Sequence, residues 1–357
     1  MSSSVTHSTD TFYGILCSGI TAKTNLSFTS SNSSFSECVR KHHICQSNTI
    51  TYQDTENNII VSAENHHFEN ATETVNNNTH TSPGRVRLTA SATFMSCEWK
   101  QCSAGHGGGI FFLSTGTLTV KDSSFTSCSS NDLADSSNGG GGAIFANNGS
   151  LSVTSTTFVD CTAKNVGGGV TGTLSCTLCR VSLSRFLCCT ARSAGGLATF
   201  HAPKCELSST LFLSCSVPET GGGMFHNGDN TYPTASLSES LFKDNSADFA
   251  NTTGDCPYRG GGACEDGGKA EYTITFLFCF FTGNTAPKGV GSDISIQRRA
   301  LAQNNINYCF TTATSGRFWN KDKYVDTWLP QGSIYFADST MCGSKARLLS
   351  PSPILVL

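Results

Sequence analysis

The chain has 357 residues, and its 23 basic and 26 acidic side chains make up only 14% of them, with a net charge of −3. Proteins that bind nucleic acids carry a strongly basic face, so this balance argues against nucleic acid as the partner. The hydrophobic residues, 38% of the total, form no run close to the roughly 18 residues that a membrane-spanning helix requires. We therefore expect no transmembrane segment and a surface rich in Ser, Thr, Asn and Gly.

Residues 1–90 are predicted to form an irregular head or N-terminal coils of the repeat that follows them. Phe35 and Cys38 have the Phe-x-x-Cys spacing of that repeat, and Phe68 follows Val61 and Ala63 at its strand spacing, but no glycine cluster follows either Phe. No secretory signal peptide is visible, because residues 1–10 are polar and the apolar stretch 12–17 is too short. A signal sequence encoded upstream of this chain would reconcile its absence here with a secreted protein.

Residues 91–295 are predicted to form an internal repeat, marked by glycine clusters at a constant interval. The last glycines of four clusters, Gly142, Gly169, Gly196 and Gly223, are 27 residues apart each time. A constant period of 20–50 residues indicates one supersecondary unit stacked on copies of itself. Alignment of the units predicts three columns of structural residues, namely Phe94, Phe125, Phe158, Phe186, Phe212, Phe242 and Phe281, then Cys97, Cys128, Cys161, Cys189 and Cys215, and then Gly109, Gly142, Gly169, Gly196, Gly223 and Gly262.

Each unit shows the alternation of a half-buried β-strand before its Phe. Positions seven and five residues before the Phe are apolar or Cys, as at Leu151 and Val153, and the residue between them is polar. The odd spacing from this strand to the Phe, the Phe-x-x-Cys spacing and the glycine cluster each require a turn. Three short strands and three turns per unit predict a parallel β-helix, right-handed by the crossover rule. An α-solenoid would need apolar residues at 3.6 spacing, and a β-propeller a longer unit.

The repeat is lost after residue 295, and residues 296–357 are predicted to form a C-terminal cap. An uncovered end of the solenoid would leave backbone groups free to pair with another molecule.

The paired signals Gly-Gly-Gly/Ala-Ile and Phe-x-x-Asn/Cys resemble the repeat of the polymorphic outer-membrane proteins, a family of surface-displayed β-helix autotransporters with adhesive roles. The resemblance covers about residues 94–294. Cys replaces most of the Asn, and only 66 residues follow Gly291, too few for the translocating barrel of that family. In both respects the chain looks more like Cys-rich protist surface proteins with similar repeats. The resemblance implies an extracellular or cell-surface location.

The cysteines and the glycosylation sequons bear on that location. Eighteen cysteines are about 5% of the chain, below the 8–10% typical of disulfide scaffolds. Because many occupy repeat columns, we expect mostly buried, inert thiols, while some disulfides remain open. Six Asn-x-Ser/Thr sequons are candidate glycosylation sites: Asn25, Asn32, Asn70, Asn77, Asn148 and Asn251.

Two features suggest hydrolase chemistry, and each has a structural alternative. His106 lies in a Gly-His-Gly-Gly-Gly run like those of β-helix polygalacturonases and lipase oxyanion holes, but catalysis also needs convergent partners, and we read it as a residue beside a repeat turn. Asp122 and Glu239 share one column about 19 Å apart, and Asp160 and Asp244 share another about 14 Å apart. Glycosidase carboxylates lie roughly 5–9.5 Å apart, so neither pair fits.

A zinc site is the third alternative. Cys176 and Cys179 form a Cys-x-x-Cys motif, and Cys188 and Cys189 follow it. Structural zinc needs four converging ligands, whereas the repeat columns already explain Cys179 and Cys189. The histidine pairs at 42–43 and 66–67 are read as surface residues.

The sequence therefore predicts an all-β protein, a right-handed parallel β-helix with an irregular head and a cap. We expect a surface or secreted adhesin-like or structural interaction protein without a catalytic site, cofactor or metal. Its partner is expected to be an extracellular glycan or protein surface. The alternative function is a polysaccharide lyase or glycoside hydrolase on the same scaffold.

Overall fold

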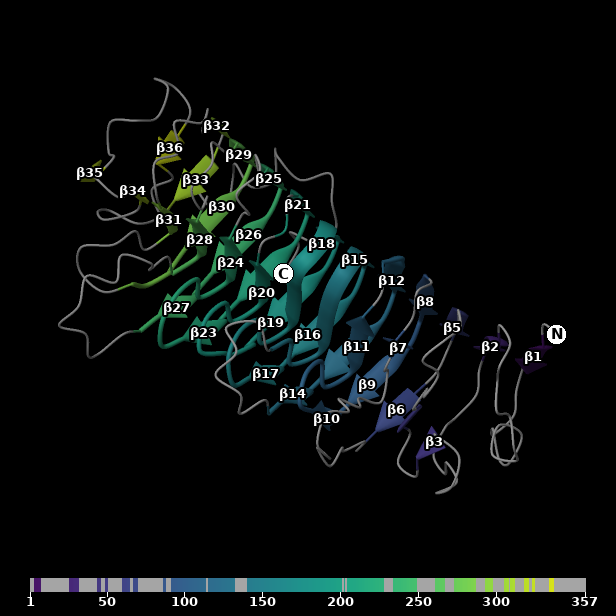
Figure 1. Cartoon of the computed structure of the whole chain (residues 1–357). Coiled ribbons are helices and arrows are strands. Elements are labelled where there is room, and N and C mark those ends of the chain that lie inside the picture. Colours follow the sequence, from purple (N-terminus) through teal and green to yellow (C-terminus); the bar gives the residue numbers. More distant parts are fainter. Residues whose placement is uncertain are drawn as a thin grey trace.

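The computed structural model describes residues 91–286 except 114, 132–139, 201, 203, 228–233, 249–260 and 267–272, then residues 293–297, and short strands on either side of this region. The described residues form an all-β structure without a helix, and long parallel sheets curl into a half-barrel (Figure 1). No helix long and apolar enough to cross a membrane occurs among these residues.

The largest sheet has 19 strands, which form two rows joined by the long strands β15 and β18. One row contains β1 (Ser3–His7), β2 (Leu26–Ser31), β5 (Ile60–Glu64), β8 (Ala92–Met95), β12 (Thr117–Lys121), β15 (Ile144–Thr154), β18 (Val170–Ser182), β21 (Lys204–Ser208), β25 (Thr234–Ser238), β29 (Thr273–Leu277) and β32 (Asn305–Asn307). The other contains β7 (Val86–Arg87), β11 (Ile110–Leu113), β15, β18, β20 (Leu197–Phe200), β24 (Met224–Asn227), β28 (Ala263–Asp266), β31 (Ile294–Gln297), β34 (Phe318–Asn320) and β35 (Lys323–Tyr324).

A second sheet of ten short strands follows the chain order. It contains β6 (His67–Glu69), β9 (Glu98–Lys100), β13 (Ser124–Thr126), β16 (Thr157–Val159), β19 (Arg185–Leu187), β22 (Leu211–Leu213), β26 (Leu241–Lys243), β30 (Phe280–Thr282), β33 (Cys309–Thr311) and β36 (Ile334–Phe336). Smaller sheets contain β10 (Ser103–Ala104), β14 (Ser129–Ser130) and β17 (Thr162–Ala163), then β23 (Ser216–Val217) and β27 (Ser246–Ala247), and then β3 (Ile44–Cys45) and β4 (Thr49–Ile50).

Successive repeat units pair with each other in parallel and in register. Strand β16 pairs with β19 so that Phe158 lies beside Phe186, and β22 continues the register with Phe212. Among the described strands only the β3–β4 and β34–β35 pairs are antiparallel. Figure 1 shows the strands of both main sheets following one another along one direction. Strands on either side of the predicted boundaries also pair in parallel, β5 with β8 at residue 90 and β31 with β34 at residue 295. The division of the chain into a head, a repeat region and a cap stays a prediction.

The aromatic residues of the ten-stranded sheet form one column in the core. Their rings lie nearly parallel, with interplanar angles of 1–8° and centroids 4.3–5.1 Å apart from Trp99 to Phe281. Six of them are the predicted residues Phe125, Phe158, Phe186, Phe212, Phe242 and Phe281, and each is fully buried. The predicted stack of Phe158, Phe186 and Phe212 is thus confirmed.

The turns predicted before and after the Phe are produced by residues with left-handed backbone conformation. Three residues before the aromatic position, φ is positive at Ser96, Asp122, Ser155, Leu183, Ser209, Glu239 and Phe278. Two residues after it, φ is positive at Gln101, Ser127, Asp160, Cys188, Ser214, Asp244 and Gly283. A single left-handed residue bends the strand sharply, so the aromatic side chain returns to the core.

The glycine cluster makes the third turn, and its three positions have different requirements. Gly167 has a φ of +62°, which favours glycine. A Cβ on Gly168 would collide with the carbonyl oxygen of Gly195 in the next unit, and a Cβ on Gly169 would lie 2.6 Å from Cδ1 of Phe186. The glycine and Phe signals therefore occur together because the aromatic ring lies against the last glycine.

The register corrects the sequence alignment in the first unit. Trp99, not Phe94, pairs with Phe125 in the aromatic column, and Phe94 pairs with Val120 on the preceding strand. Cys97 accordingly lies beside Ser123, since its backbone N–H donates to the Ser123 hydroxyl. The predicted column contained only Phe residues, so Phe94 was assigned to it in place of Trp99, which fills the same position.

A second correction concerns the glycine column. Ile144 pairs with both Ile110 and Val170, which places Ala143, not Gly142, level with Gly109 and Gly169. Gly142, although it is the last glycine of its cluster, occupies the middle position of the turn, as Gly168 does in the next unit. The constant spacing of 27 residues from Gly142 to Gly169 therefore joined two different positions of the turn.

We expect Gly169→Ala to lower the free energy of unfolding by about 1–3 kcal/mol, because the added methyl group overpacks the contact with Phe186. Urea denaturation measures the change. Ala143→Gly, at the equivalent position of the preceding unit, is the matched control and should cost less than about 1 kcal/mol. An unchanged midpoint in Gly169→Ala would show that the ring does not depend on this glycine.

Candidate functional site

In the 19-stranded sheet, the row that runs from β8 through β12, β15, β18, β21 and β25 to β29 has a regular array of hydroxyl groups on its outward side. We call this array the hydroxyl face. Thirteen of its 20 described positions are Ser or Thr, three are basic, one is acidic and three are apolar. The positions are Ser91, Thr93, Met95, Thr117, Thr119, Lys121, Ser150, Ser152, Thr154, Leu178, Arg180, Ser182, Lys204, Glu206, Ser208, Thr234, Ser236, Ser238, Thr275 and Leu277. They alternate with buried residues such as Leu151 and Val153, and equivalent positions repeat about every 4.8 Å along the sheet.

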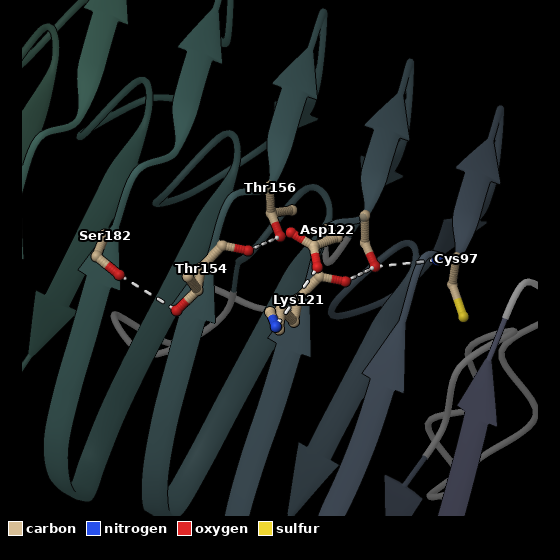
Figure 2. Close-up of polar contacts among 7 residues, drawn as sticks. Cys97, Lys121, Asp122, Thr154, Thr156 and Ser182 are labelled. Carbon is tan, nitrogen blue, oxygen red and sulfur yellow. Dashed lines mark hydrogen bonds and ion pairs between the residues drawn. The ribbon is translucent and has the colours of Figure 1, made fainter. Parts of the chain in front are cut away.

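Hydrogen bonds between neighbouring strands order part of this array. The hydroxyls of Thr154 and Ser182 lie 3.2 Å apart, and those of Ser150 and Thr177 lie 2.9 Å apart. Figure 2 shows the Thr154–Ser182 contact beside Lys121 on the next strand. Side chains in such columns lose rotamer freedom during folding, so less entropy is lost when a ligand binds to them.

A second row of hydroxyls is buried at the turn beside the hydroxyl face. Ser123, Thr156, Ser184, Thr210 and Ser240 lie two residues before the aromatic column, and each donates to the backbone carbonyl two residues earlier at 2.7–2.9 Å. The Ser123 and Ser184 hydroxyls also accept a backbone N–H from the preceding unit (Figure 2 shows this for Cys97). These bonds satisfy buried polar groups and fix the edge of the hydroxyl face.

Three charged side chains form the centre of the hydroxyl face. Glu206 accepts a hydrogen bond from Nε of Arg180 at 2.6 Å and lies 2.6 Å from Nζ of Lys204. Lys204 first, and then Arg180, lower the pKa of the Glu206 carboxyl below its ordinary value. About half of the surface of each basic side chain stays exposed, at 50% for Arg180 and 52% for Lys204. No local sequence motif marks this cluster, because its members are neighbours only through the strand register.

The predicted carboxylate columns exist, and both lie on turns. Asp122 and Glu239 occupy the left-handed position before the aromatic column, and Asp160 and Asp244 the one after it. Asp122 lies 3.7 Å from Nζ of Lys121 at the edge of the hydroxyl face (Figure 2). The in-register strands between the members of each pair keep them several strand spacings apart.

The cysteine column is buried next to the aromatic column. Cys128, Cys161, Cys189 and Cys215 are fully buried thiols, and burial raises the pKa of each well above its ordinary value. Each Sγ donates to the carbonyl oxygen of the aromatic residue one unit earlier, as Cys215 does to Phe186 at 3.5 Å. High pKa values and burial make these thiols unreactive, as the sequence predicts.

Asparagine replaces cysteine in the two units that contain β26 and β30, and it makes the same contact. Asn245 Nδ2 donates to the Phe212 carbonyl at 3.1 Å, and its Oδ1 accepts the backbone N–H of Cys215 at 2.9 Å. Asn284 repeats this arrangement with Phe242 and Asn245. The two residue types are therefore alternative donors to one backbone carbonyl, which explains why both occur in the Phe-x-x-Asn/Cys signal.

The four cysteines of the zinc alternative have different environments. Cys176, Cys179 and Cys189 are buried, whereas Cys188 is exposed on a turn. Within the described part of the chain, no group of three or more His, Cys, Asp or Glu is arranged to hold a metal ion. The zinc reading thus gains no support from the arrangement of these residues.

His106, the residue of the hydrolase alternative, and His226 both contact other side chains. His106 stacks on Phe145, with centroids 4.9 Å apart, so the residue beside the glycine turn has a packing contact. His226 on β24 is fully buried, and its Nδ1 lies 2.5 Å from the Thr199 hydroxyl. Its Nε2 has no hydrogen-bond partner, and burial lowers its pKa to about 4. The histidines at 42–43 and 66 lie outside the described residues, and so does the side chain of His67.

One of the predicted glycosylation sites is described. Asn148 lies in β15 at an irregularity in the pairing with β18, has a φ of 67° and is partly exposed. The other candidates, Asn25, Asn32, Asn70, Asn77 and Asn251, lie outside the described residues.

Comparison with known proteins gives no relative: no family model, no curated protein and no solved structure matches the chain.

Proposed function

We propose that this chain is a secreted or cell-surface interaction protein, adhesin-like or structural, which binds an extracellular glycan on its hydroxyl face. The observation that carries this proposal is the density of Ser and Thr on that face, 13 of 20 positions, on an ordered parallel sheet. Hydroxyl groups both donate and accept hydrogen bonds, as sugar hydroxyls do. A protein surface is the second partner class that suits the same polar face.

The proposal includes the finer architecture and its family. We propose that the units form a right-handed parallel β-helix, since parallel crossover connections are right-handed in nearly all proteins. The parallel register of consecutive units and the aromatic column support this proposal. The Gly-Gly-Gly/Ala-Ile and Phe-x-x-Asn/Cys signals support a repeat of the polymorphic outer-membrane type, in its Cys-rich protist form. An extracellular location follows from that resemblance and from the sequons.

A blocking experiment on the hydroxyl face tests the function. The variant Thr119→Tyr/Ser152→Tyr places two bulky side chains on neighbouring strands of the face. The matched control, Ser124→Tyr/Thr157→Tyr, does the same on the ten-stranded sheet. Binding to a glycan array is measured for both. We expect the first variant to lose at least about tenfold in affinity, because two side chains would obstruct a surface that the ligand must approach closely. Equal binding by both variants would overturn the proposal.

A further inference from the structure

We propose that the ligand of the hydroxyl face is an anionic polysaccharide, held along a diagonal row of three basic residues, Lys121, Arg180 and Lys204. This inference rests on the proposed function, because it names the ligand class of the same face. The inference goes beyond the proposed function because it assigns the sign of the ligand's charge and the direction in which the ligand crosses the strands.

The row follows from the strand register. Lys121 lies level with Thr154 and Ser182, and Arg180 is two residues before Ser182. Arg180 lies level with Glu206, and Lys204 is two residues before Glu206. With strands about 4.8 Å apart and residues about 3.3 Å apart, the Cα atoms of Lys121 and Arg180 are about 12 Å apart and those of Arg180 and Lys204 about 8 Å apart. The three residues therefore cross the face on one diagonal.

The charge balance of the face differs from that of the whole chain. The chain carries a net charge of −3, whereas the 20 positions of the hydroxyl face hold three basic residues and one acidic residue. At the edge of the face, the Asp122 carboxylate lies 3.7 Å from Nζ of Lys121 and offsets part of the charge of that residue. Side-chain exposure of 50–52% keeps the three basic groups accessible to a ligand. A positive row on an otherwise acidic protein attracts polyanions and turns them toward this face. The surrounding hydroxyls suit sugar hydroxyl groups between successive anionic groups.

Glu206 limits the strength of this row. Its carboxylate contacts both Arg180 and Lys204 at 2.6 Å, so it neutralises part of their charge while it holds the two groups in one place. A polyanion must compete with this carboxylate. Removal of the carboxylate should therefore raise affinity for an anionic ligand, an effect opposite to that expected from damage to the face.

The test measures binding of the full chain to heparin, polygalacturonate and neutral dextran at two salt concentrations. Wild type should bind the two polyanions more tightly than dextran, and more weakly in high salt. Arg180→Gln and Lys204→Gln should each weaken polyanion binding roughly fivefold, and Glu206→Gln should strengthen it by a similar factor. Lys243→Gln, an exposed lysine on the ten-stranded sheet, is the control and should bind as wild type does.

The outcomes separate this inference from the proposed function. Equal affinity for dextran and polyanions, or weaker polyanion binding by Glu206→Gln, would overturn the inference. If a neutral glycan binds and Thr119→Tyr/Ser152→Tyr abolishes that binding, the proposed function stands without it. If no glycan binds wild type, both are overturned.

Discussion

Phe212→Ala is expected to lower the free energy of unfolding by about 3–5 kcal/mol. Phe212 is fully buried, and its ring stacks between Phe186 and Phe242 with centroids 4.8 Å from each. Truncation removes two stacking contacts and leaves a cavity inside the column, so both the lost transfer free energy and the void contribute. Denaturation followed by circular dichroism measures the loss.

Leu213→Ala is the matched control for this prediction. Leu213 is the next residue of β22, half-buried and on the opposite side of the strand. We expect this change to cost about 1 kcal/mol or less. Equal losses in Phe212→Ala and Leu213→Ala would show that the aromatic column does not stabilise the protein more than the outer side of the sheet.

Acidification is expected to destabilise the protein through His226. Its pKa in the folded state is about 4, below the ordinary value of 6.5. Between these two pH values the unfolded chain binds a proton that the folded chain does not, so stability is complete above about pH 6.5 and falls as the pH drops toward 4. The loss from this one group is about 3 kcal/mol.

A variant isolates that contribution from other titrating groups. His226→Gln keeps a polar side chain beside the Thr199 hydroxyl but has no proton to gain. Urea midpoints are compared for the two proteins at pH 7.5, 5.5 and 4. The difference between variant and wild type should change in favour of the variant by about 3 kcal/mol across this range. A pH-independent difference would contradict the burial of a neutral His226.

The strand and aromatic pattern could be predicted from the sequence because it is repeated. Leu118, Val120 and Phe125 have counterparts in each of the following units up to Phe281, and parallel strands place counterparts side by side. The turns on either side of the Phe were also predictable, because the residue spacing before and after the Phe does not fit a straight strand with all apolar side chains inward. Their conformation was not, because side chains as different as Asp122, Leu183 and Phe278 all adopt the same positive φ.

Other features depend on positions that the repeat does not mark. Trp99 fills the aromatic column although the next six members, from Phe125 to Phe281, are all Phe, and Ala143 occupies a glycine position. The Arg180–Glu206–Lys204 cluster requires the register between β18 and β21, which no local motif encodes. His226 belongs to an inward column whose other members include Gly172 and Thr199, so no sequence pattern identifies it as buried.

The in-register stacking of consecutive units can be measured as one distance in solution. Thr119 and Thr275 occupy the same column of the hydroxyl face, five strands apart, through Ser152, Arg180, Glu206 and Ser236. Nitroxide labels on keto amino acids incorporated at these two positions, read by double electron–electron resonance, should give a narrow distribution centred at about 24 Å. A broad distribution, or a mean distance above about 40 Å, would contradict the stacking of the units and the binding face derived from it.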